Sequence, residues 1–309
     1  MYVDFDSSSP TVMHVIPGGN RATGGVTSLG DDVFVVREDS HGKIEVYDAK
    51  TFTLQRHIAV PGLGDCPYGL VACSHNNCLY ASDSVNDSVH RVELSGSDAV
   101  MKWSVARRPA GLSVNGEHNL IVVSTAESKL QIFTTVGTLL QVIQLQAHIG
   151  HPWNAIRLPA LLQNIQRHGQ LGFPVHAVQR SSDTFLVSHC SYVHRVCLVG
   201  VDGSVVRSYG GQEPEEGAER TRLNGPSGLA VDGEGRVLVA DRCNDRLLVM
   251  DQSLSSAHEM SVSVDGGLKG PDSLWYDQSR GRLYVGERNG GRVIAVDSLK
   301  DFAVSKVSA

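Results

Sequence analysis

The sequence lacks several features that would assign it directly to a membrane, to the secretory pathway or to a cysteine-based site. It contains no apolar run of about 18 residues, the shortest length of a transmembrane helix. Its N-terminal segment, MYVDFDSSSP, has neither the basic nor the apolar part of a secretory signal peptide. None of its six cysteines forms a CxxC pair, although Cys73 and Cys78 flank one predicted hairpin turn. These absences predict a cytoplasmic protein with reduced thiols that does not enter a membrane.

An excess of positive charge is also missing. The chain has 27 Lys and Arg against 33 Asp and Glu, which gives a net charge of −6. Nucleic-acid binders take most of their affinity from neutralised phosphates. The composition therefore argues against a protein that binds nucleic acid over its whole surface. A basic patch on one face remains compatible with this total.

The sequence does contain a repeated phrase. The segment GPSGLAVDGEGRVLVADRCNDRLLVMD, residues 225–251, returns as GPDSLWYDQSRGRLYVGERNGGRVIAVD, residues 270–297. Sliding the phrase along the chain gives six copies, aligned on the polar residue that closes the second apolar run. That column consists of Glu38, Asp83, Ser124, His189, Asp241 and Glu287. A period of roughly 40–50 residues indicates an array of one supersecondary unit.

The apolar runs within each copy are short, rich in β-branched residues and bounded by Gly, Asn, Asp and Ser, which is typical of strands. Four strands per copy predict an all-β fold, a six-bladed β-propeller of four-stranded antiparallel blades. Residues 1–309 are expected to form this single domain. An irregular or short helical insert, about residues 148–172, is expected before blade four.

The copies resemble the NHL repeat. Blade five carries the pattern most fully, with Pro226, Gly228, the triplet 230–232, Asp241 and the Asn244-x-Arg246 turn. Blade six matches in part, and the remaining copies keep mainly the hydrophobic frame. The resemblance implies a six-bladed NHL-type propeller, a fold found in tripartite-motif proteins that bind RNA or protein and in some enzymes.

A basic residue follows the column residue by five positions in several copies. Three such pairs stand across one short loop each: Glu38/Lys43, Asp241/Arg246 and Glu287/Arg292. Because the pairs recur, we interpret them as ion pairs that fix the hairpin of strands two and three. A catalytic group would be needed only once.

Blade four departs from this pattern. Its column positions are His189 and His194, and His176 lies in the first strand. Three imidazoles are a possible zinc set, but the spacing does not bring all three together. We therefore expect a hydrogen-bonded histidine pair, no bound metal and no cofactor.

Two segments compete for the innermost strand of blade four. Residues 152–156 (PWNAI) and residues 174–178 (PVHAV) both have the proline start of the other copies. The segment that is not the strand belongs to the insert, in which residues 160–168 are compatible with a short amphipathic helix.

The loops between strands two and three of each blade share one propeller face with the loops between blades. On that face we expect a partner-binding set in which arginines lie beside aromatic residues, consisting of Arg107, Arg108, Trp153, Tyr192, Arg242 and Arg288. The acidic run 213–219 lies on the same face and disfavours RNA. The expected function is a non-catalytic scaffold that binds a protein partner, with RNA as the second choice.

The alternative is an enzyme, a hydrolase or lyase that uses the central channel and its small-molecule ligand. The channel-lining candidates are Tyr68, Ser227 and Asp272. Amidating lyases of similar fold carry zinc-binding histidines directly after the starting proline, where this chain has none. A gluconolactonase-like cation site needs about six oxygens, and Asp272 with two neutral neighbours supplies few. A strictosidine-synthase-like pocket has few diagnostic residues and stays open.

The chain ends are expected to close the ring. The run Thr11 to Ile16 can complete blade six, and Ala303 to Val307 can add a short outer strand. Sharing the last blade between both ends would tie the first unit to the last.

Overall fold

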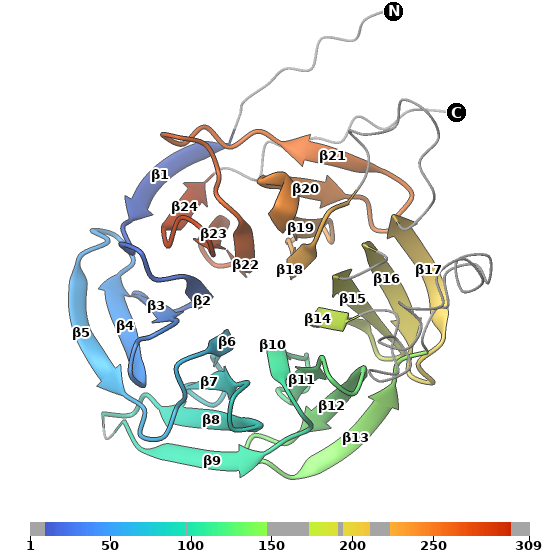
Figure 1. Ribbon diagram of the computed structural model, residues 1–309, viewed down its shortest axis with the longest axis horizontal. Coiled ribbons are helices and arrows are strands. Elements are labelled where there is room, and N and C mark those ends of the chain that lie inside the picture. Colours follow the sequence, from blue (N-terminus) through green and yellow to red (C-terminus); the bar gives the residue numbers. More distant parts are fainter. Residues whose placement is uncertain (1–9, 97, 147–172, 191–193, 211–222, 298–309) are drawn as a thin grey trace, which may run out of the picture.

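The computed structural model describes residues 10–96, 98–146, 173–190, 194–210 and 223–297. Within them, 24 strands form six four-stranded antiparallel sheets arranged around a central channel (Figure 1). The expected fold class is confirmed. The insert 148–172 and the strand expected at 303–307 lie outside the described residues.

The first three blades are built from consecutive strands. From the channel outward they comprise β2 (Thr23–Leu29), β3 (Asp32–Arg37), β4 (Lys43–Asp48) and β5 (Leu54–Ala59); β6 (Pro67–Cys73), β7 (Cys78–Asp83), β8 (Ser88–Glu93) and β9 (Val100–Ser104); and β10 (Pro109–Val114), β11 (Leu120–Ser124), β12 (Lys129–Phe133) and β13 (Leu139–Gln144).

The last three blades follow the same plan, except that the sixth takes its outer strand from the N-terminal part of the chain. They comprise β14 (Phe173–Ser181), β15 (Thr184–Cys190), β16 (Arg195–Gly200) and β17 (Val205–Gly210); β18 (Pro226–Val231), β19 (Val237–Asp241), β20 (Arg246–Met250) and β21 (Ala257–Met260); and β22 (Pro271–Asp277), β23 (Arg282–Glu287), β24 (Val293–Asp297) and β1 (Thr11–Ile16). The innermost strand of blade four is therefore the segment that contains residues 174–178.

Each pair of neighbouring blades encloses its own apolar cluster. Phe34 and Leu79, for example, pack between blades one and two, and Leu186 and Val239 pack between blades four and five. Burial of one Val or Leu side chain contributes roughly 1.5–3 kcal/mol. The repeated apolar runs thus stabilise the ring through six similar interfaces rather than one central core.

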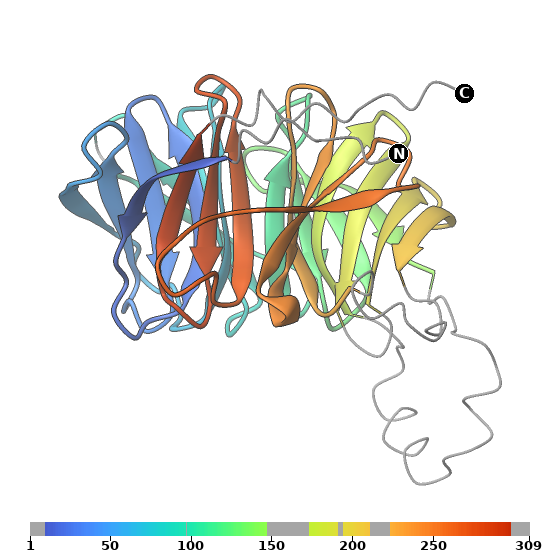
Figure 2. The same ribbon diagram turned by 90° about the horizontal axis from the view of Figure 1, so that it is seen from above.

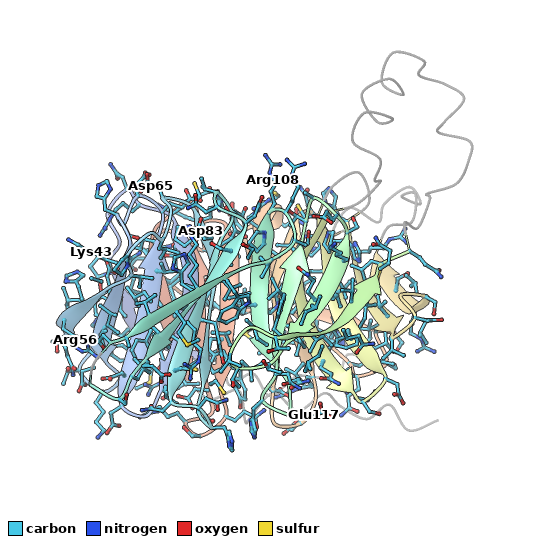
Figure 3. All side chains as sticks on the ribbon, turned by 90° about the horizontal axis from the view of Figure 1, so that it is seen from below. Lys43, Arg56, Asp65, Asp83, Arg108 and Glu117 are labelled. Carbon is cyan, nitrogen blue, oxygen red and sulfur yellow. The ribbon has the colours of Figure 1, made fainter. Side chains whose placement is uncertain are left out.

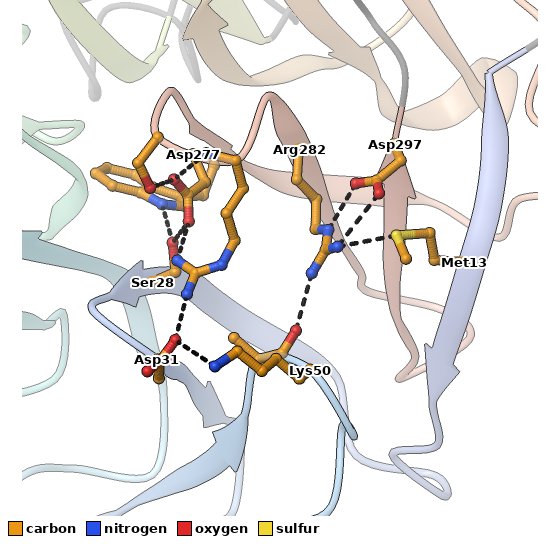
Figure 4. Close-up of polar contacts among 11 residues, drawn as sticks. Met13, Ser28, Asp31, Lys50, Asp277, Arg282 and Asp297 are labelled. Carbon is orange, nitrogen blue, oxygen red and sulfur yellow. Dashed lines mark hydrogen bonds and ion pairs between the residues drawn. The ribbon is translucent and has the colours of Figure 1, made fainter.

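Strand β1 closes the ring by pairing antiparallel with β24, from Thr11 opposite Asp297 to Ile16 opposite Val293. The expected closure of blade six by this segment is confirmed. On the blade-six side of the junction, Arg282 forms an ion pair with Asp297 at 2.6 Å and donates to the carbonyl oxygen of Ala49 in blade one at 2.9 Å (Figure 4).

A second set of contacts crosses the same junction near the channel. The Ser28 hydroxyl donates to Asp277 and accepts from the Trp275 indole, both at 2.8 Å. Arg280 joins Asp277 to Asp31 of blade one (Figure 4). The first and last blades are therefore held together by hydrogen bonds as well as by strand pairing.

The propeller has two faces, seen edge-on in Figure 2. Lys43, Asp65, Asp83 and Arg108 lie toward one of them, and Glu117 lies toward the other (Figure 3). We call the first the loop face, because it carries the loops between second and third strands and between blades. No helix in the described part of the chain is long and apolar enough to cross a membrane.

Candidate functional site

A cavity of about 670 Å³ occupies the channel between the six inner strands. Tyr68 and Asp272, two of the expected channel residues, line it at the loop-face end. Ser227 is buried instead, and its hydroxyl lies 3.4 Å from each of the carbonyl oxygens of Ala240 and Pro271. Ser227 therefore holds neighbouring strands together, and the channel mouth is formed by the other two residues.

Two of the expected partner-binding arginines meet the channel residues at this mouth. The Arg242 guanidinium lies 3.5 Å from the Asp272 carboxylate, and the Arg288 guanidinium lies 3.6 Å from its other oxygen. Arg288 also lies over the Tyr68 ring, 5.0 Å from the centroid, and pairs with Glu38 at 2.6 Å. We call Glu38, Tyr68, Arg242, Asp272 and Arg288 the mouth cluster.

The electrostatics of the mouth cluster fix the ionisation of its tyrosine and its two arginines. Burial, followed by the charge of Asp272, raises the pKa of Tyr68, so its phenol is neutral and can donate a hydrogen bond. Burial alone would lower the pKa of Arg242 and of Arg288. The negative charge of Asp272 nevertheless raises the pKa of Arg242 overall, and Tyr68, followed by Asp272 and Glu38, raises the pKa of Arg288. The cluster therefore combines two permanent cations and one neutral hydroxyl with the paired carboxylates of Glu38 and Asp272.

Arg107 and Arg108 lie on the loop face between blades two and three, and both are exposed. Their backbone amides are bound by acidic side chains, Arg107 by Glu127 at 2.9 Å and Arg108 by Asp87 at 2.8 Å. The loop is therefore fixed while both side chains are exposed, and that of Arg108 points away from the loop face (Figure 3). Trp153, Tyr192 and the acidic run 213–219 lie outside the described residues.

His176 occupies the channel wall and is bonded through both ring nitrogens to the backbone. Its Nε2 donates to the carbonyl oxygen of Leu112 at 3.1 Å, and its Nδ1 accepts from the amide of Leu229 at 3.3 Å. Burial lowers its pKa to about 4, so the ring is neutral. With both nitrogens engaged, the imidazole offers no lone pair to a metal.

The other histidines of blade four serve the loop face. His194 accepts a hydrogen bond from the amide of Gly225 at 3.0 Å, and His189 lies opposite Pro174 in the pairing of β14 with β15. No group of three or more His, Cys, Asp or Glu side chains in the described segments is arranged to hold a metal ion.

The acidic column locks the hairpins, as its recurrence indicated, in blades five and six. Asp241 pairs with Arg246 at 2.8 Å, and Glu287 pairs with Arg292 at 2.6 Å. The expected Glu38/Lys43 pair is wrong. Glu38 turns to Arg288 instead, because that guanidinium lies in reach from the neighbouring blade.

The column carboxylates also fix the loop that leads into their own blade. Asp83 accepts from the amide of Gly64, Asp241 from that of Asn224 and Glu287 from that of Lys269, at 2.6–3.0 Å. This role explains why an acid recurs even in blade two, where no arginine follows it.

The sequence did not predict that two cysteines, Cys190 and Cys243, lie next to the mouth cluster. The Cys190 sulfur lies 3.6 Å from the Arg242 guanidinium, and the Cys243 thiol lies close by beside Gly225. All six cysteines are free thiols, and Cys73 stands opposite Cys78 in the β6–β7 pairing without a disulfide. Nothing in their spacing marks Cys190 or Cys243 as neighbours, because they belong to different blades.

A family model described as the NHL repeat matches residues 223–250, which contain the first three strands of blade five. Among curated proteins, the chain is similar to the protein brain tumor of Drosophila melanogaster, with 26% identity over 156 residues. The match covers 50% of this chain and only 12% of that relative.

Solved structures share the fold at low identity. Virginiamycin B lyase from Staphylococcus aureus superposes with a TM-score of 0.61 at 8% identity, covering 93% of this chain and 99% of the lyase. Kuenenia stuttgartiensis hydrazine synthase gives 0.62 at 13% identity, covering 97% and 99%. The WD40 propeller domain of Doa1 gives 0.60 at 14% identity, covering 95% and 99%. At such identities the likeness concerns the fold alone. The repeat match, the relative and the six blades together identify the chain as an NHL-repeat β-propeller.

Proposed function

We propose that this chain is a non-catalytic interaction module that binds a protein partner through the loop face, centred on the mouth cluster. The observation that carries the proposal is the meeting of Arg242, Arg288 and Tyr68 at the channel mouth. Arginine and tyrosine are enriched among residues that dominate binding energy, especially where neighbouring side chains exclude water. Here three blades contribute them to one place.

The surroundings of the mouth cluster support the same function. Arg107 and Arg108 add two exposed guanidinium groups on a loop that is fixed by Glu127 and Asp87. A fixed backbone lowers the entropy that binding costs, while the long side chains can still adapt to a partner. The NHL repeat match and the similarity to the protein brain tumor are in keeping with this proposal.

The test compares proteins captured from cell extract by the wild-type chain and by three variants. One carries Arg107→Glu and Arg108→Glu, one carries Arg242→Gln and Arg288→Gln, and the control carries Glu117→Lys on the opposite face. We expect one set of proteins to be lost from both loop-face variants and kept by the control. Equal capture by all four would contradict the proposal.

Nuclease treatment of the extract separates protein from RNA partners. If capture disappears after the treatment, and purified single-stranded RNA binds with a steep dependence on salt, the partner is RNA instead.

A further inference from the structure

The channel combines two chemically different regions. At the loop-face end it is bordered by Tyr68 and Asp272, against which Arg242 and Arg288 lie. Deeper in the channel the apolar lining residues are Val178 and Trp275 together with the nearly buried Val26, Leu112 and Leu229. Polar residues, among them Ser28, Gln179, Asp277 and Gln278, line it as well. A cavity of about 670 Å³ falls within the range of small-molecule sites, roughly 300–1,000 Å³.

The two guanidinium groups have hydrogen-bonding capacity left over. Nη1 of Arg288 is buried without a hydrogen-bond partner and lies 3.6 Å from Asp272. Arg242 reaches the same carboxylate at 3.5 Å. Charge-assisted hydrogen bonds between such groups usually span about 2.7–2.9 Å, so one aspartate is shared loosely between two arginines. Arg288 already pairs with Glu38 through its other terminal nitrogen, Nη2, at 2.6 Å. The open donor is therefore Nη1, and an anionic group placed between the two guanidinium groups would occupy it.

The rest of the channel disfavours a cationic ligand. Asp277, at the other end, is already bonded to Ser28, Ser279 and Arg280. His176 on the wall is neutral and bonded through both nitrogens. No carboxylate among the described lining residues is therefore left for a cationic ligand except Asp272, which faces two arginines.

We propose that the channel binds a small organic anion with an apolar body. Its carboxylate, phosphate or sulfonate head lies between Arg242 and Arg288 and accepts from the Tyr68 hydroxyl, and its body occupies the apolar part of the channel. This site adds a small-molecule ligand to the protein-binding face and does not depend on that function.

The experiment uses matched pairs of probes on the purified chain. Octanoate is compared with octanamide, and 2-naphthoate with 2-naphthamide, by isothermal titration calorimetry and ligand-observed NMR. We expect one carboxylate per chain to bind about tenfold or more tightly than its amide, because only the anion pairs with both guanidinium groups. Replacing both arginines by methionine should remove this preference while leaving amide binding nearly unchanged.

A second variant separates the channel from the surface. Val178→Phe narrows the apolar part and is remote from the loop face, so both members of each pair should bind several-fold more weakly. Capture of protein partners should not change, and thermal unfolding verifies that the variant is folded. The proposal fails if no probe binds, if acid and amide bind equally, or if the double methionine variant keeps the preference. It also fails if Val178→Phe leaves carboxylate binding intact, which would mean that the arginines bind an anion at the surface, as an acidic side chain of a partner would supply.

Discussion

The Nε2 atom of His176 lies 3.1 Å from the carbonyl oxygen of Leu112, while the other ring nitrogen accepts from the amide of Leu229. One side chain of blade four thus bonds to the inner strands of blades three and five. In both neighbours the aligned residue is a glycine, Gly111 and Gly228. The histidine substitution that looked like a candidate metal ligand is a structural bridge.

Replacing His176 by alanine should lower the free energy of unfolding by about 2–4 kcal/mol. The change leaves a buried amide and a buried carbonyl without this partner and removes a packed ring. Urea denaturation followed by circular dichroism measures the effect. The exposed His258 provides the control, and its alanine variant should stay within about 0.5 kcal/mol of wild type. Equal losses would show that the bridge contributes nothing.

The bridge should also make stability depend on pH. Burial lowers the pKa of His176 from 6.5 to about 4, so between these values the unfolded chain binds more protons than the folded one. The contribution of His176 is therefore complete above pH 6.5 and is lost as the pH falls toward 4, at up to about 1.4 kcal/mol per pH unit. Unfolding titrations of wild type and His176→Gln over this range should differ in slope. Parallel profiles would contradict a buried neutral imidazole.

Glycines of the inner strands are required by the approach of the next blade. A Cβ atom on Gly228 would lie 2.6 Å from the carbonyl oxygen of Asp272 and 2.8 Å from the amide of Leu274. Gly228→Ala should therefore destabilise the chain by about 1–3 kcal/mol. Gly116, which has nothing within 4 Å of its Cβ position, is the matched control and should tolerate alanine. Differential scanning calorimetry measures the melting temperatures of the two variants. A lower value for Gly228→Ala alone indicates a steric clash with the next blade, whereas equal losses would indicate a general effect of replacing glycine.

The contribution of each column carboxylate to the free energy of unfolding should increase with the number of groups that it binds. Asp241 is fully buried and accepts from the amide of Asn224, from Asn244 and from Arg246. Asp241→Ala removes the buried counter-charge of Arg246, which keeps the exposed Glu259 at 3.6 Å, and leaves two further donors without this acceptor. The variant should cost about 3–5 kcal/mol in chemical denaturation. Lys43→Ala, at the position whose expected pairing is wrong, should change stability by no more than about 0.5 kcal/mol. A large effect at Lys43 would restore the original interpretation of that blade.

Several features of the fold were predictable because they depend on residues near each other in sequence. Alternating apolar runs and turn residues predicted the strands, and the repeat predicted the number of blades. The Asp241/Arg246 pair was predictable because a hairpin brings those two positions together. Glu38 shows the limit of this reasoning, since its partner Arg288 is close only after the ring has closed.

By itself the sequence determined the fold class, the six units, the shared last blade and two of the residues that line the channel, Tyr68 and Asp272. Tertiary structure alone decided how these residues combine. Arg288 of blade six meets Glu38 of blade one and Tyr68 of blade two, and Arg242 of blade five meets Asp272 of blade six. Sequence spacing specifies pairing within a blade. Contacts between blades depend instead on the radial arrangement of the sheets and on where long side chains end, and the mouth cluster consists of such contacts between blades.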